Sequence, residues 1–141
     1  MTLHVLVPFD GSAHAERGLA WAIENRPDAA ITVLSVADPL SEASGDVAGA
    51  PLDSGSDARA DGGLPAVDRF AREHGVELRS VVAVGTPAAT IVEYADEHPT
   101  DAIVMGTRGR SGLRRLLFGS VAETVARRAS VAVTLVPDES L

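Results

Sequence analysis

The sequence predicts an α/β fold in which helices cover both faces of a parallel β-sheet. Two observations lead to this prediction. Short runs of aliphatic and β-branched residues alternate along the chain with segments whose apolar residues recur at helical spacing. The strand-like runs are almost continuously apolar, which is typical of strands buried on both faces. We expect a single domain over residues 1–141, a usual length for one folding unit.

The first part of the chain predicts a strand, a helix and a second strand. Leu3–Val7 is an apolar run that ends before a proline and an Asp-Gly turn pair. Ser12 is a suitable N-cap for a helix that continues to about Asn25, where a Pro-Asp pair follows. Ala30–Val36 is the second predicted strand.

The segment Asp38–Gly63 differs in composition, being rich in Ser, Gly, Asp, Ala and Pro. Because such residues bury little apolar surface, they do not offset the entropy of ordering, and we predict a long flexible loop. A helix over Leu64–His74 and a third strand over Val76–Val84 follow.

The last part predicts two further helix and strand pairs. Thr86-Pro87 opens a helix that runs to about Glu97, since proline suits the first helical turn. Ala102–Met105 is the fourth strand, Ser120–Arg128 a helix and Val131–Val136 the fifth strand. Ligands of parallel sheets bind beyond the carboxyl ends of the strands, where the winding direction reverses. The candidate ligand-binding residues are therefore those that directly follow the predicted strands.

Composition excludes several classes of function. The chain has no cysteine, which excludes disulfides, thiolate metal sites and a cysteine nucleophile. Its net charge is −8, and all 12 of its cationic residues are arginine, a composition typical both of salt-loving organisms and of GC-rich genomes. The acidic surface disfavours nucleic-acid binding. Without a secretory signal or an apolar run near roughly 18 residues, we expect a cytoplasmic protein with no membrane partner.

Positive charge gathers in one segment of this acidic chain. Residues 106–128 hold six arginines and one acid, Glu123. Glycines there permit close backbone approach to a ligand, and the free N–H groups at a helix start favour phosphate. Arg108 and Arg110 add charge, and Ser120 adds a hydroxyl donor. The same residues would also suit a glycine-rich turn with a capping serine. No P-loop is possible without lysine.

The spacing Gly106-x2-Gly109-x9-Gly119-Ser120 resembles the G-2x-G-9x-G-S/T pattern of the universal stress protein family, in its ATP-binding branch. The resemblance covers nearly the whole chain. It includes four further stretches: Val7–Ser12, Asp101–Gly109, Leu116–Val125 and Val131–Pro137.

The resemblance implies an open five-stranded sheet of order 3-2-1-4-5, Rossmann-like and of the adenine nucleotide alpha hydrolase type. The reversal then lies between strands one and four, where Asp10 and Gly106 emerge. By resemblance, Asp10 would accept from the adenine amino group, Pro8 and Val36 would line the adenine pocket, and Gly106 and Thr107 would lie by the ribose. The phosphate segment would comprise Gly109, Arg110, Ser111, Gly112, Gly119, Ser120 and Val121, with Arg108 at a commonly basic or histidine position.

Metal ligands and catalytic residues are not indicated. A Mg or Mn ion would be carried mainly by the nucleotide. The histidines His4, His14, His74 and His98 show no ligand-like spacing and are expected to be structural or exposed. No His or Asp is expected around Ser12 to make it a nucleophile. With no Lys or Glu general base in the pocket, we expect weak ATP hydrolysis at most.

The sequence thus predicts a nucleotide-binding stress-response regulator that acts as a dimeric energy or stress sensor. Two alternatives stay open: a slow ATPase or other nucleotide-using enzyme of the superfamily, and a dimerisation protein that binds no nucleotide. Residues 131–136 would form an apolar edge strand, and we expect a homodimer through this strand, as relatives commonly form.

Overall fold

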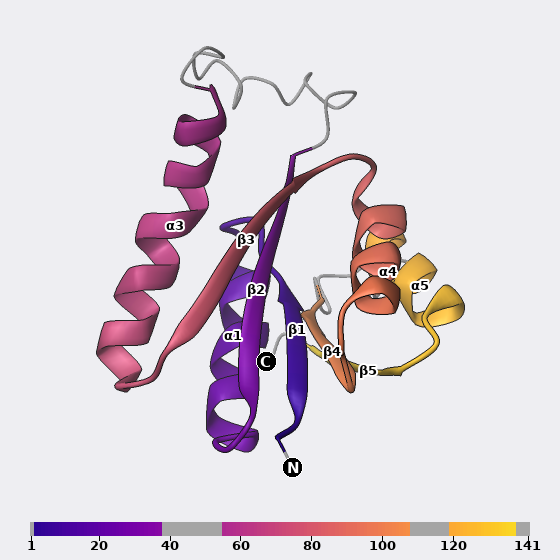
Figure 1. Ribbon diagram of the computed structural model, residues 1–141, viewed down its shortest axis with the longest axis horizontal. Coiled ribbons are helices and arrows are strands. Elements are labelled where there is room, and N and C mark those ends of the chain that lie inside the picture. The colour runs from indigo at the N-terminus through magenta and orange to yellow at the C-terminus, as the bar shows by residue number, and fades with distance from the viewer. Residues whose placement is uncertain (1, 38–54, 108–118, 138–141) are drawn as a thin grey trace.

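The computed structural model describes residues 2–37, 55–107 and 119–137. Strands and helices alternate along this part of the chain (Figure 1). The strands are β1 (His4–Pro8), β2 (Ala30–Ala37), β3 (Leu78–Val84), β4 (Ala102–Gly106) and β5 (Ala132–Val136). The helices are α1 (Ala13–Asn25), α3 (Gly55–His74), α4 (Pro87–Glu97) and α5 (Gly119–Arg128).

The strands form one parallel sheet with the order β3-β2-β1-β4-β5. Strand β1 lies at the centre, with Val5 paired to Ile31 of β2 on one side and to Ala102 of β4 on the other. The winding direction therefore reverses between β1 and β4. This order confirms the fold predicted from the sequence.

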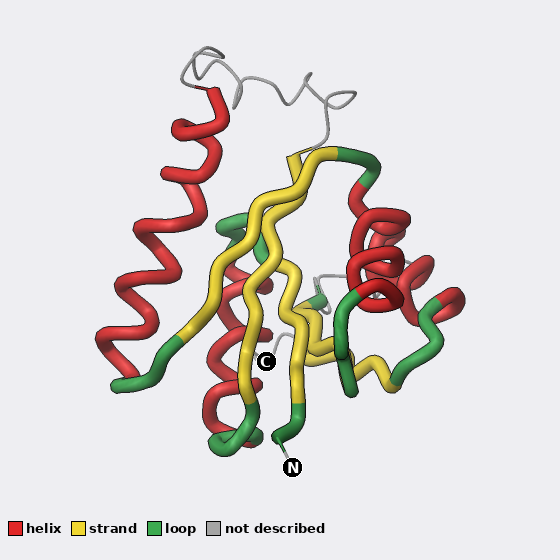
Figure 2. Tube along the Cα trace, in the orientation of Figure 1, coloured by secondary structure: helices red, strands yellow, loops and turns green. Residues whose placement is uncertain are grey.

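Helices cover both faces of the sheet, as Figure 2 shows: α1 and α3 lie on one face, and α4 and α5 on the other. Alternate strand side chains point to opposite faces, so two apolar layers form. One layer joins strand residues to α1 and α3: Val5, Val7, Ile31, Val33 and Val104 with Leu19, Ala22 and Val67. The other joins strand residues to α4 and α5: Leu6, Leu34, Ile103 and Met105 with Ile91, Ala95 and Val125.

The end of α3 explains why β3 begins later than predicted. The Val76 N–H donates to the Ala71 carbonyl oxygen at 3.0 Å, and Gly75 adopts a φ of 64°. This left-handed residue after the helix, with a bond back across its last turn, is a Schellman-type cap. Val76 therefore belongs to the helix cap, and the strand begins at Leu78.

Helix α3 begins at Gly55, whereas the sequence predicts a loop as far as Gly63 and a helix from Leu64. The prediction rests on apolar composition, and only Ala58, Arg59 and Ala60 among residues 55–63 have high intrinsic helix propensity. Pro65 lies inside the helix, where it lacks the N–H of a normal turn. Residues 38–54, the rest of the predicted loop, lie outside the described residues.

Across the described ranges, no helix is both long enough and apolar enough to cross a membrane.

Candidate functional site

The turn after β1 places a carboxylate at the reversal point of the sheet. Gly11 has a φ of 85°, which favours glycine, and the Ser12 N–H donates to Asp10 Oδ1 at 2.9 Å. This side-chain bond to the backbone two residues on is an Asx turn. Ser12 then caps α1, because its Oγ accepts from the Ala15 N–H at 3.1 Å. The cap confirms the helix start predicted at Ser12.

The start of α1 packs directly on the end of β4 through glycine. A β-carbon placed on Gly106 would collide with the carbonyl oxygen of His14. On the helix side, a β-carbon on Gly18 would lie 2.6 Å from the Gly106 backbone nitrogen. Only residues without side chains permit this approach, so the two glycines fix the position of α1 beside β4.

A pocket of about 230 Å³ opens where these elements meet, at the carboxyl ends of β1, β2 and β4. Its volume lies just below the roughly 300–1,000 Å³ of usual small-molecule sites, so it suits one ring system of a larger ligand. The residues that line it are Pro8, Phe9, Asp10, His14, Ala15, Leu34, Val36, Pro87, Ile91, Met105, Gly106, Val121 and Ala122.

The pocket lining is mainly apolar and carries few polar side chains. Among its described lining residues, Asp10 and His14 alone have ionisable side chains. Leu34, Ile91 and Met105 are buried and give the pocket an apolar inner wall. An apolar slot with few, well-placed polar groups is the usual form of a site for a small organic ligand.

The structure brings together five of the predicted site residues: Pro8, Asp10, Val36, Gly106 and Val121 all line the pocket. Their role in binding stays a prediction.

The other predicted residues fall elsewhere. Thr107 is buried, and its N–H donates to the Val136 carbonyl oxygen at 2.9 Å; it is not among the lining residues. Gly119 and Ser120 begin α5, directly before Val121. The remaining predicted residues, Arg108, Gly109, Arg110, Ser111 and Gly112, lie outside the described ranges.

His14 is a pocket residue that the sequence did not indicate, since an isolated histidine early in a helix resembles a surface residue. Its Nε2 lies 3.1 Å from Ser12 Oγ. His14 therefore stands beside Ser12, because the second helical residue folds back towards the N-cap. The Asp10 bond goes to the Ser12 backbone N–H, so the pair forms part of a cap rather than a catalytic triad.

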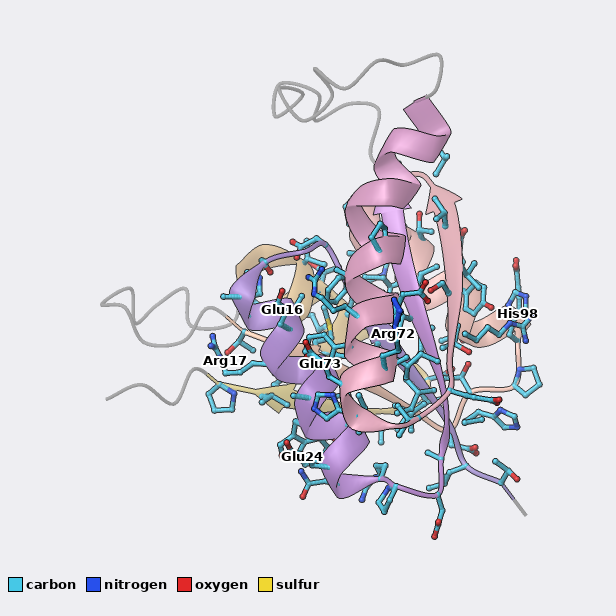
Figure 3. All side chains as sticks on the ribbon, turned by 90° about the vertical axis from the view of Figure 1, so that its left-hand side faces the viewer. Glu16, Arg17, Glu24, Arg72, Glu73 and His98 are labelled. Carbon is cyan, nitrogen blue, oxygen red and sulfur yellow. The ribbon has the colours of Figure 1, made fainter. Side chains whose placement is uncertain are left out.

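His74 and His98 have structural roles at helix ends, as predicted. Each Nδ1 lies 3.0 Å from a carbonyl oxygen four residues earlier, of Phe70 and Tyr94 respectively. Each ring also stacks on the aromatic ring of that residue. Figure 3 shows His98 on the opposite side of the sheet from Glu16 and Arg17 of α1. Among the described residues, no group of His, Cys, Asp or Glu is arranged to hold a metal ion.

The fold and the pocket define an α/β protein with a mainly apolar pocket at the reversal point of a parallel sheet. Residues 1–137 match the universal stress protein family, and the chain belongs to that family.

Two curated relatives illustrate the match. Universal stress protein MJ0531 of Methanocaldococcus jannaschii is 45% identical over 73 residues, which are 52% of this chain and 43% of that protein. The chain thus matches less than half the length of this relative. Putative universal stress protein SAUSA300_1656 of Staphylococcus aureus is 30% identical over 142 residues, covering 98% of this chain and 86% of that protein.

Two solved structures share the fold. A universal stress protein in complex with cAMP is 30% identical, with a TM-score of 0.65 over 95% of this chain and 96% of that one. A universal stress protein family protein from Arabidopsis thaliana, solved with AMP bound, is 21% identical. Its TM-score is 0.71, over 98% of this chain and 93% of that one.

Proposed function

We propose that this protein binds an adenine nucleotide, ATP in particular, in the pocket between β1, β4 and α5. The observation that carries the proposal is the pocket's position. Gly106 at the end of β4 and Val121 in the first turn of α5 line the pocket, and the G-2x-G-9x-G-S/T pattern begins at Gly106 and ends directly before Val121. An adenine nucleotide is also the ligand named for two related structures.

The base would occupy the apolar pocket. Val36 and Ile91 line it, and Asp10 supplies a carboxylate that can accept from an exocyclic amino group. One carboxylate oxygen of Asp10 accepts the Ser12 N–H. A carboxylate has several acceptor positions, so a bond to the base is compatible with the turn.

The phosphates would lie at the start of α5. Free N–H groups and the helix dipole at a helix N-terminus favour anions. The proposed contacts from α5 are Gly119, Ser120 and Val121, with residues 106–112 completing the site as the sequence predicts. A Mg²⁺ or Mn²⁺ ion would be carried mainly by the nucleotide, take few protein ligands and offset the charge of the phosphates.

The protein would act as a regulator in the cytoplasm, with nucleotide occupancy reporting energy or stress state. The described pocket wall holds Asp10 and His14 as its ionisable groups, which suits binding better than phosphoryl transfer. Slow ATP hydrolysis is the second candidate. Strand β5 is the last strand in the sheet order, and we propose a homodimer through its open edge.

The binding proposal is tested by denaturing purified protein, identifying released nucleotide, and titrating ATP, ADP, AMP and cyclic AMP by calorimetry. Gly109→Val and Ser120→Ala are expected to weaken ATP binding, because the first blocks backbone approach and the second removes a donor. Arg127→Ala is the control, since Arg127 is exposed and pairs with Glu123 at 2.7 Å. Failure of all four nucleotides to bind would reject the proposal.

Two further measurements test the proposed metal ion and the alternative function. Chelation of divalent cations should weaken ATP binding more than AMP binding, because the metal offsets the charge of adjacent phosphates. Turnover of ATP above about one per second, the low end of ordinary enzymes, would favour the enzyme over the regulator.

A further inference from the structure

His14 lines the pocket but belongs to none of the sequence stretches that carry the family resemblance. It lines the pocket from α1, together with Gly106 of β4 and Val121 of α5. Its carbonyl oxygen lies so close to the Gly106 Cα that no β-carbon fits there. The backbone of His14 therefore has a fixed position relative to the end of β4.

The imidazole of His14 is also held in place. Its Nε2 lies 3.1 Å from Ser12 Oγ, which accepts the Ala15 N–H at the helix cap. The Ser12 N–H donates in turn to Asp10 Oδ1. Ser12 thus connects the two ionisable residues of the described pocket wall. A ring held by hydrogen bonds loses less entropy when a ligand binds.

The chemistry of these two residues suggests which part of a nucleotide each faces. The Asp10 carboxylate attracts an amino group on a base and repels phosphate. The imidazole of His14 can donate a hydrogen bond to oxygen and carries positive charge when protonated. His14 also contacts Gly106, and both residues line the pocket together with Val121 in the first turn of α5.

We infer that His14 is a ligand-contacting residue whose imidazole binds the sugar–phosphate part of the nucleotide and favours phosphate-bearing ligands over the nucleoside. This inference rests on the proposed nucleotide binding. A purely structural role in the α1 cap makes a different prediction: loss of the ring would then weaken all ligands of the pocket equally.

The test is calorimetric titration of the full chain at pH 7 with adenosine, AMP and ATP. His14→Ala should weaken AMP and ATP binding roughly tenfold or more, the loss typical of a hydrogen bond to a charged group. Adenosine affinity should change by less than about threefold. His14→Gln keeps a donor and should restore part of the AMP and ATP affinity. His98→Ala is the matched control, because the His98 ring is likewise held at a helix end, beside the Tyr94 carbonyl oxygen, but His98 does not line the pocket.

A second readout does not depend on a variant folding well. In NMR spectra of the unaltered protein, AMP should shift the ring signals of His14 and leave those of His74 and His98 in place. Equal losses for adenosine and ATP in His14→Ala, or unmoved His14 signals under saturating AMP, would overturn the inference while nucleotide binding stands. If the unaltered protein binds none of the three ligands, the proposed function fails first, and this inference with it.

Discussion

Gly18 of α1 packs against Gly106 at the end of β4, so closely that a β-carbon on Gly18 would lie 2.6 Å from the Gly106 backbone nitrogen. Both glycines stand where a helix face meets a strand end, and Gly106 also lines the pocket. The packing of α1 on the sheet and the shape of the pocket thus depend on the same contact.

Gly18→Ala tests this contact because two effects oppose each other. Helix propensity alone favours alanine by about 1 kcal/mol. The new methyl group would meet backbone atoms, which yield less readily than a flexible side chain, and overpacking typically costs about 1–3 kcal/mol. We expect a net decrease of up to about 2 kcal/mol in the free energy of unfolding, measured by urea denaturation. Increased stability would contradict the close packing.

Ser12→Ala should lower the free energy of unfolding by about 1 kcal/mol, because it removes the N-cap of α1. It also removes the hydroxyl beside His14, so we expect poorer discrimination between AMP and adenosine. Thr86→Ala is the matched control, since Thr86 is the N-cap of α4 but makes no side-chain capping bond. Similar stability losses for the two variants would argue against the capping role of Ser12.

Asp10→Asn should weaken ATP binding by about tenfold while leaving the turn intact. Asparagine also forms Asx turns, so the bond to the Ser12 N–H is kept. The loss follows because a neutral amide is a weaker acceptor than a carboxylate for an exocyclic amino group. Asp101→Asn is the control, since Asp101 Oδ2 accepts the His4 N–H at the opposite, N-terminal end of the strands. Unchanged ATP affinity in Asp10→Asn would contradict the proposed contact between Asp10 and the base.

Thr134→Lys should convert the proposed homodimer into a monomer, because lysine on an edge strand opposes strand pairing. Thr134 lies within β5, and Ser80 lies within β3 at the other end of the sheet order. Ser80→Lys is therefore the control. Light scattering at micromolar concentration measures the mass of the unaltered protein and of both variants. A monomeric unaltered protein, or a dimer that persists in Thr134→Lys and dissociates in Ser80→Lys, would contradict the β5 interface.

Local sequence signals predict the elements of the fold well. Continuous apolar runs such as Leu3–Val7 indicate buried strands because burial on both faces requires them. The Ser12 cap and the proline at the start of α4 are likewise local, since hydrogen bonding and fixed φ act within one turn. The start of α3 at Gly55 is missed because residues 55–63 show no apolar periodicity and mostly have low helix propensity.

The sequence by itself determined the alternating elements, their order in the sheet through family resemblance, and the pocket residues at or just after strand ends, such as Gly106 and Asp10. Only the tertiary structure decided the other walls of the pocket. His14 and Ile91 belong to helices on opposite faces of the sheet, and nothing local to either residue indicates that they line one pocket. They come together because β1 and β4 are neighbours and glycine lets α1 approach β4, and both are long-range contacts.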